Sequence, residues 1–263
     1  MSQAHYEVLA VRHGLFETRR SDFYLNYGEY GQPDAPLELA YWFWVIRGGG
    51  RTIVVDSGYS ADGAARRKRT VILPVAEALA ALGIGPRSDV DVVVTHAHYD
   101  HIGNLDLFPI QRFFISPEES AFWLGAESRH RQFQSVVEDA DLVQLERLVA
   151  SGRAQFVVGR REIAPGVVLH PFPGHTPGQL VVTVETAHGR IVLASDACHL
   201  SEELDRDMPF KHNTDLIGLY RGLEQLRRWR DAGDLIIPGH EPSTLEDFAC
   251  LDGPLAEHAV RIA

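Results

Sequence analysis

One short stretch, THAHYDH at residues 95–101, most tightly constrains what this chain can fold into. It follows the apolar run DVVV, which predicts a buried strand that ends at the histidines. Alternate side chains of an extended segment point the same way, so His96 and His98 can bind one metal ion. Asp100 and His101 come at the following turn, where they can reach a second ion. Imidazole and carboxylate ligands suit zinc, iron, manganese or cobalt, and zinc is the commonest in hydrolysis.

Three more residues of metal-binding type stand where other predicted strands end. His175 lies in the constrained turn PFPGHTPGQ, Asp196 follows the apolar run IVLAS, and His240 follows LIIPG. Each residue alone has a simpler explanation, and Asp196 in particular could cap a turn. Because ligands collect at strand ends in sheet proteins, the three are expected to join the first cluster.

Apolar runs and turn residues divide the rest of the chain into strands and helices, with no low-complexity linker. Strands are predicted at 6–13, 39–48, 50–58, 89–96, 111–116, 153–159, 166–174, 178–186, 189–196 and 234–239. Helices are predicted within 70–85, 117–125, 214–233 and 243–260, and the whole of 117–152 is expected to be mostly helical. The aromatic, polar stretch 21–36 is typical of a loop.

Charge and composition exclude several classes of function. A formal net charge of −11 argues against a nucleic-acid partner, because phosphate binding requires a basic face. The run of basic residues at 66–69 is an exception to this acidic composition. It is interpreted first as a solvated surface turn or helix start, and second as a binding site for an anionic group of a substrate. Two cysteines make no disulfide framework. No signal-peptide pattern and no apolar run of ~18 residues is present, so a cytoplasmic protein without a membrane partner is expected.

The motifs THAHYDH, GHTPGQ, SD and PGH, in this order, resemble those of the metallo-β-lactamase superfamily over most of the chain. The stretch VDSG, with Asp56, is similar to the first motif of that family, whose aspartate lies beside the metal ligands. The resemblance implies an α/β fold, the αββα sandwich, as a single domain over 1–263 with a helical insertion around 117–152. It implies two divalent ions, most simply zinc, held by His96, His98 and His175 on one side and by Asp100, His101 and His240 on the other, with Asp196 bridging.

Departures from other branches of the superfamily favour one group. Redox members carry an acidic residue where this chain has His98, which points to hydrolysis. Only 23 residues follow His240, too few for the glutathione-binding region of related thioesterases. The chain is most similar to the N-acyl homoserine lactonases, which degrade quorum-sensing signals. Those enzymes usually place a tyrosine three residues beyond the bridging aspartate, where this chain has His199.

The hypothesis for the mechanism is that a metal-bridging hydroxide opens a lactone ring, with Asp100 carrying the proton. His199 can take over the role of the tyrosine by donating a hydrogen bond to the carbonyl; the alternative is a structural hydrogen bond beside the site. The expected partner is a small-molecule substrate, and a homodimer is possible. Candidates for substrate contact come from the aromatic loop, the helical insertion and the stretch MPFKHN: Tyr24, Tyr27, Phe122, Trp123, Phe210 and His212.

Two other functions stay open at this point. The same metal site can hydrolyse a thioester, an amide or a cyclic imide, because all of these reactions pass through a similar oxyanion. A non-enzymatic metal-binding module is the third interpretation, although the full set of seven ligands argues against a decayed site. Activity on a panel of acyl substrates discriminates among the three.

Overall fold

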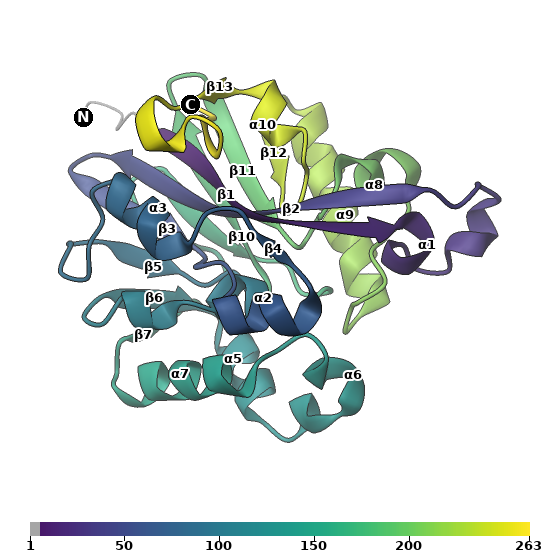
Figure 1. Cartoon of the computed structure of the whole chain (residues 1–263), viewed down its shortest axis with the longest axis horizontal. Coiled ribbons are helices and arrows are strands. Elements are labelled where there is room, and N and C mark those ends of the chain that lie inside the picture. Colours follow the sequence, from purple (N-terminus) through teal and green to yellow (C-terminus); the bar gives the residue numbers. More distant parts are fainter. Residues whose placement is uncertain (1–5) are drawn as a thin grey trace.

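Two β-sheets form the centre of the chain in the computed structural model, which describes residues 6–263 (Figure 1). The strands of the larger sheet are β1 (Glu7–Arg19), β2 (Pro36–Gly48), β3 (Arg51–Val55), β4 (Thr70–Val71), β5 (Asp91–Val93), β6 (Arg112–Ile115), β7 (Ala154–Phe156), β13 (Ala249–Cys250) and β14 (Ala259–Arg261). The smaller sheet consists of β8 (Arg161–Ala164), β9 (Val167–Pro171), β10 (Leu180–Thr186), β11 (Gly189–Ser195) and β12 (Leu235–Pro238). Their orders are β13-β14-β1-β2-β3-β5-β6-β7, with β4 beside β1, and β12-β11-β10-β9-β8.

The helices occupy the connections between strands. They are α1 (Arg20–Phe23), α2 (Ala61–Arg67), α3 (Val75–Ala81), α4 (Tyr99–Ile102), α5 (Pro117–Leu124), α6 (Arg131–Gln134), α7 (Asp139–Ala150), α8 (Ser201–Arg206), α9 (Leu216–Asp231) and α10 (Thr244–Asp247). Short 3₁₀ turns are η1 (Tyr27–Tyr30), η2 (Leu105–Leu107), η3 (Glu127–Arg129) and η4 (Gly253–Leu255). None of the helices in 6–263 has the length and apolar character needed to cross a membrane.

Strand β2 shows why the chain forms four layers. Its side chains alternate, so Trp42 and Trp44 enter the core between the sheets, while Phe43 and Val45 enter the core under α3 and α7. A strand that is apolar on both faces needs a covering layer on each side. On the other flank, Leu223 of α9 packs against the smaller sheet. The prediction of an αββα sandwich is confirmed (Figure 1).

The prediction of a closing helix over 243–260 is wrong. The segment instead contains α10, β13 and η4, and it leads into β14, which pairs antiparallel with β1, with Ala10 opposite Val260. By pairing with β1, β14 satisfies the backbone hydrogen-bonding groups along that edge of β1. Its Val260 is also fully buried in the core between the sheets. Gly253, with a φ of +72°, and Pro254 prevent a continuous helix over this segment.

The ten predicted strands are all present, although most are shorter than the apolar runs, and β1 extends to Arg19. Sequence patterns missed β4, β8, β13 and β14, which are short. The prediction of a mostly helical segment at 117–152 is confirmed by α5, η3, α6 and α7, which lie together beyond β7 in Figure 1. Their apolar faces, including Trp123, Leu145 and Leu148, join the core on the outer side of the larger sheet.

Asp141 on α7 gives the fold a testable pH dependence. Burial, together with the carboxylate of Glu138, raises the pKa of Asp141 from 3.8 to about 7. Because the folded pKa exceeds the unfolded one, the contribution of Asp141 to stability is full below about pH 4 and is lost as the pH rises through about 7. We expect the free energy of unfolding of Asp141→Asn, relative to that of the parent, to rise by roughly 1 kcal/mol for each pH unit between about pH 4 and about pH 7.

Urea unfolding of both proteins at about pH 5 and about pH 8 measures the effect, and the stability difference should be larger at the higher pH. Asp139→Asn, an exposed change two residues away on the same helix, is the matched control. A stability difference that is the same at both pH values would contradict the assignment to Asp141.

Candidate metal centre and active site

The predicted ligands meet at the ends of strands from both sheets. Strands β3 and β5 are parallel neighbours in one sheet, and β11 and β12 are parallel neighbours in the other. Parallel strands end at the same edge, so the residues that follow them gather there. The histidines of THAHYDH follow β5, Asp196 follows β11, and His240 follows β12. His175 joins them from the turn between β9 and β10.

The first group of ligand atoms comprises His96, His98, His175 and Asp196, and these atoms lie within 4.8 Å of one another. His98 Nδ1 is 3.0 Å from His96 Nε2 and 3.0 Å from His175 Nε2. Asp196 Oδ2 lies 3.4 Å from His175 Nε2. Three ring nitrogens and one carboxylate oxygen thus converge on one point, the ligand number and type of a tetrahedral zinc site.

The second group comprises Asp100, His101 and His240, again within 4.8 Å. The other oxygen of Asp196, Oδ1, lies 3.2 Å from Nε2 of both His101 and His240. Asp100 Oδ2 is 3.8 Å from the same two nitrogens. His240 Nε2 is also 3.3 Å from Asp196 Oδ2. Asp196 therefore lies between the two groups with an oxygen within reach of each, the position expected of a carboxylate that bridges two ions.

Unpartnered polar atoms show that this cluster fits cations. Among the described residues, His101 Nε2 and Asp196 Oδ1 are buried without a hydrogen-bond partner, and both point into the cluster. A buried polar atom is normally paired, and a metal ion would pair both. The donor set, five imidazoles and two carboxylates, leaves two divalent ions with a net positive charge. The residues present thus fit two divalent ions.

The pKa shifts of the histidines lead to the same conclusion. Burial lowers the pKa of His96, His98 and His175 well below the usual value, so these rings are neutral, as metal ligands must be. Burial also disfavours the charged form of His101, but the carboxylates of Asp196, Asp56 and Asp100 outweigh it and raise its pKa. The second group therefore carries enough negative charge to hold a cation.

Hydrogen bonds outside the cluster orient three of the rings. His240 Nδ1 lies 3.0 Å from Ala40 O, and His175 Nδ1 lies 2.9 Å from His212 O. His101 Nδ1 is 2.8 Å from Asp56 Oδ2. An Nδ1–H that donates outward leaves Nε2 free for a metal, which is how such partners usually fix a ligand.

Asp56 is itself held firmly. Its carboxylate accepts hydrogen bonds from Thr95 N at 2.8 Å and Thr95 Oγ1 at 2.7 Å, and it is fully buried. Its φ of +64° is unusual for a residue other than glycine. These bonds tie the turn after β3 to the start of THAHYDH and set the position of His101.

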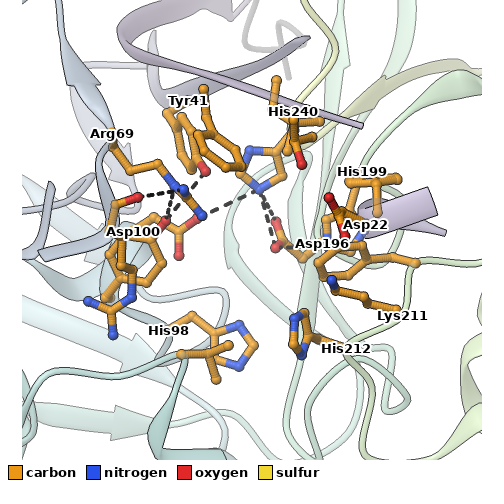
Figure 2. A pocket seen from close by; sticks show the side chains of 18 of the residues that line it. Asp22, Tyr41, Arg69, His98, Asp100, Asp196, His199, Lys211, His212 and His240 are labelled. Carbon is orange, nitrogen blue, oxygen red and sulfur yellow. Dashed lines mark hydrogen bonds and ion pairs between the residues drawn. The ribbon is translucent and has the colours of Figure 1, made fainter. Parts of the chain in front are cut away.

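A cavity of about 470 Å³ opens onto the cluster (Figure 2). Metal-ligand side chains form its floor, and aromatic and aliphatic residues from β1, β2 and the segment after α8 form its walls. Figure 2 shows Arg69 and Tyr41 on one side of the floor and Lys211 and His212 on the other. An apolar cavity with a few convergent polar groups is the usual form of a small-molecule site.

Comparison with known proteins identifies the scaffold. A family model described as "Metallo-beta-lactamase superfamily" matches residues 38–240. The chain belongs to the metallo-β-lactamase superfamily. The relatives it resembles are hydrolases, so it is a metallo-β-lactamase-fold hydrolase with a cluster of histidines and aspartates able to bind metal.

One curated relative, the N-acyl homoserine lactonase AiiB of Agrobacterium fabrum, is 32% identical over 188 residues, which cover 66% of this chain and 64% of the relative. A solved structure of a quorum-quenching N-acyl homoserine lactone lactonase superposes with a TM-score of 0.74 at 19% identity, covering 96% of this chain and 97% of the other. A structure of AidC, described as a dizinc quorum-quenching lactonase, gives 0.73 at 20% identity, covering 92% and 90%. At these identities the structural comparisons show the fold alone.

His199 lies in the cavity of this metallo-β-lactamase fold, between two carboxylates. Its Nε2 is 3.1 Å from Asp196 Oδ2, and its Nδ1 is 3.2 Å from Glu203 Oε1. Burial opposes a charge on the ring, but the two carboxylates outweigh it and raise the pKa of His199 to about 9. Glu203 also accepts the backbone N–H of His199, at 2.7 Å, so it fixes the main chain that carries the ring.

The six candidates for substrate contact divide into two sets. Phe210 and His212 line the cavity. Tyr24 and Tyr27 do not, because Tyr24 packs behind Phe23 and donates to Glu202 at 2.6 Å, and Tyr27 donates to Pro33 O at 3.0 Å. Phe122 and Trp123 also lie outside the cavity: their rings pack edge to face, and the indole of Trp123 packs edge-on against the His98 ring.

Sequence patterns missed much of the cavity wall. Phe16, from the part of β1 beyond the predicted strand, and Leu39 and Tyr41 of β2 line it. Tyr99, between two of the predicted ligands, is 5% exposed, yet it lines the cavity. Strand alternation predicts the face of the sheet on which a side chain lies. It does not show which part of that face is covered by the other sheet and which part lines a cavity.

Glu119, near the start of α5, is the most consequential residue that the sequence did not reveal. It is fully buried, and Oε1 accepts from Ala97 N at 2.8 Å and from Trp123 Nε1 at 2.6 Å. Oε2 accepts from Gly178 N at 2.9 Å. One side chain thus ties the strand end that carries His98 to the turn that carries His175. An acidic residue in the first turn of a helix is common, so no local signal marks it.

Proposed function

We propose that this chain is a hydrolase with two divalent metal ions, most simply zinc, that opens the ring of a lactone. The observation that carries the proposal is the position of Asp196 between the two ligand groups, with Oδ2 near His175 and Oδ1 near His101 and His240. The relatives described as N-acyl homoserine lactonases support the substrate class, and AidC, described as a dizinc lactonase, supports the metal.

The seven ligands would hold the ions in the two groups described. When bound, two divalent ions would supply an activated water at neutral pH and would polarise the substrate carbonyl. A bound substrate would displace water from this point, and a lower local dielectric strengthens the electrostatic interactions there.

Asp100 is the residue we assign to proton transfer. Ring opening bonds the oxygen of a water to the acyl carbon, breaks the acyl carbon–oxygen bond of the ring, and moves one proton of the water to the departing alkoxide. Asp100 lines the cavity, so its carboxylate can take that proton and deliver it. His199 lies across the floor from Asp100, and we assign it a hydrogen bond from Nε2 to the substrate carbonyl oxygen.

The test is hydrolysis by protein loaded with zinc, followed by acid release. The panel contains acyl homoserine lactones of short and long chain, simple γ- and δ-lactones, acyl thioesters, amides and a cyclic imide. Turnover is expected on lactones, and a chelator should lower the rate by at least about 100-fold until zinc is restored. In the same assay, His199→Phe is expected to lower kcat about 100-fold with the metal content unchanged.

Other outcomes of these assays would point to a different function or mechanism. Turnover of thioesters, amides or imides without turnover of lactones would transfer the function to that class of acyl substrate. Bound metal with no turnover on the panel would favour a metal-binding module. Full activity of His199→Phe would remove that residue from the mechanism and leave the lactonase assignment intact.

A further inference from the structure

Three long basic side chains line the cavity, and they differ in whether their charge is already matched. Arg67 pairs with the carboxylate of Glu138 and donates to Ser135 O and Val137 O at 3.1 Å and 2.8 Å, so its charge is satisfied. Lys211 is largely exposed, and solvent screens its charge. Arg69 is half-buried, and the acceptors it has among the described residues are a phenol and a carbonyl, with no carboxylate.

The turn after α2 aims Arg69 into the cavity. Lys68 takes a left-handed conformation, with a φ of +55°, and the Arg69 N–H donates to Ala64 O at 2.9 Å. This turn sends the successive basic residues of the run in different directions. Arg66 points outward to Glu138, and Arg69 points inward over the metal-binding floor (Figure 2).

The guanidinium of Arg69 is held rigidly but is not saturated. Nε donates to Tyr99 Oη at 3.0 Å, one terminal nitrogen donates to Arg67 O at 2.7 Å, and the group lies 3.4 Å from the centre of the Phe16 ring. A guanidinium has five N–H donors in one plane, so these two bonds leave three for a ligand. A fixed planar fork of this kind matches the geometry of a carboxylate.

The nearest floor carboxylate does not neutralise it. Figure 2 shows Arg69 reaching over Asp100, but no ion pair forms between them among the described contacts, and Asp100 belongs to the second ligand group. Two divalent ions with Asp100 and Asp196 retain a net positive charge, and Arg69 adds to it. The interior of the cavity therefore favours an anion beside the reacting ring.

We propose that Arg69 binds a carboxylate carried by the substrate, so that the preferred lactone is an anionic one. The inference rests on the proposed lactonase function and narrows it to a substrate class. The carboxylate would lie against Phe16 and Arg69, with the scissile carbonyl over the ligand groups. A neutral lactone would leave this cation partly desolvated and unmatched, which penalises its binding.

The test compares paraconate, a γ-butyrolactone with one ring carboxylate, with its neutral carboxamide. Arg69→Gln is expected to lower kcat/KM for paraconate by about 10- to 100-fold, mainly through KM, because a charged hydrogen bond is lost. Hydrolysis of the carboxamide should change by less than about 3-fold, and it reports that the variant is folded. Arg66→Gln, the same change in the same basic run but outside the cavity, should leave both substrates unaffected.

Calorimetric binding of paraconate to the zinc-loaded protein separates this inference from the proposed function. If no lactone is hydrolysed, binding that weakens about 10- to 100-fold in Arg69→Gln still supports the carboxylate site. Binding that is equal in the parent and Arg69→Gln, with or without turnover, overturns it. An equal loss of activity on paraconate and the carboxamide also overturns it, because Arg69 would then act on the reacting carbonyl or on the fold.

Discussion

Asp196→Ala is expected to lower kcat/KM for any substrate of this site by at least about 1,000-fold, the loss that several kcal/mol of metal stabilisation represents. The reason is geometric. Both oxygens of Asp196 lie among ring nitrogens, with Nε2 of His101, His175 and His240 at 3.2, 3.4 and 3.2 Å. No other carboxylate among residues 6–263 joins both ligand groups, so its loss should cost more than the loss of a single histidine.

Metal content and activity, measured on the same preparation, check this prediction. The parent is expected to bind two zinc ions per chain, and Asp196→Ala one or fewer. Asp205→Ala, an exposed change on α8 that removes an ion pair with Arg230, is the matched control and should retain both metal and activity. Two tightly bound ions with full activity in Asp196→Ala would show that the carboxylate does not bridge.

Glu119→Ala is expected to be the most destabilising single change near the site, at about 4 kcal/mol of unfolding free energy. The change leaves the N–H groups of Ala97, Gly178 and the Trp123 indole buried without an acceptor, and each such loss costs roughly 1–3 kcal/mol. Because two of these groups lie beside metal ligands, zinc affinity should also fall by about 10- to 100-fold.

Urea unfolding of the metal-free protein and competition with a zinc chelator measure the two effects separately. Glu118→Ala, the exposed neighbour on the same helix, should have little effect on either. Glu119→Gln retains one acceptor oxygen but places an amide against a donor, so an intermediate loss is expected. A stability of Glu119→Ala equal to that of Glu118→Ala would mean that solvent reaches the three donors.

Local pattern was sufficient for most of the strands and failed at the end of the chain. The runs that became β5, β10 and β11 are apolar and are bounded by turn residues, so their identity is fixed by their own side chains. The segment that ends in β14 has helical spacing but pairs with β1, more than two hundred residues earlier. A short strand that forms because it pairs with the open edge of a distant strand need not show the alternating apolar pattern of a strand in its own sequence.

Local pattern also failed to predict which residues line the cavity. Phe210 and Trp123 are both aromatic and both close in sequence to functional segments, yet Phe210 lines the cavity and Trp123 packs behind a ligand. Arg66, Arg67 and Arg69 belong to one basic run, yet Arg66 lies outside the cavity, Arg67 lines it with its charge matched by Glu138, and Arg69 lines it after the left-handed turn at Lys68. Residue type and spacing do not distinguish such neighbours.

The sequence by itself determined the superfamily, the αββα fold and a group of metal-ligand types, because each ligand directly follows a strand or occupies a rigid turn that the chain encodes locally. Only the tertiary structure decided that Glu119 joins two of the ligand segments and that Arg69 faces the cavity with unused donors. These features depend on contacts between residues distant in the chain. Such contacts follow from how the two sheets and their helices pack, which no single segment specifies.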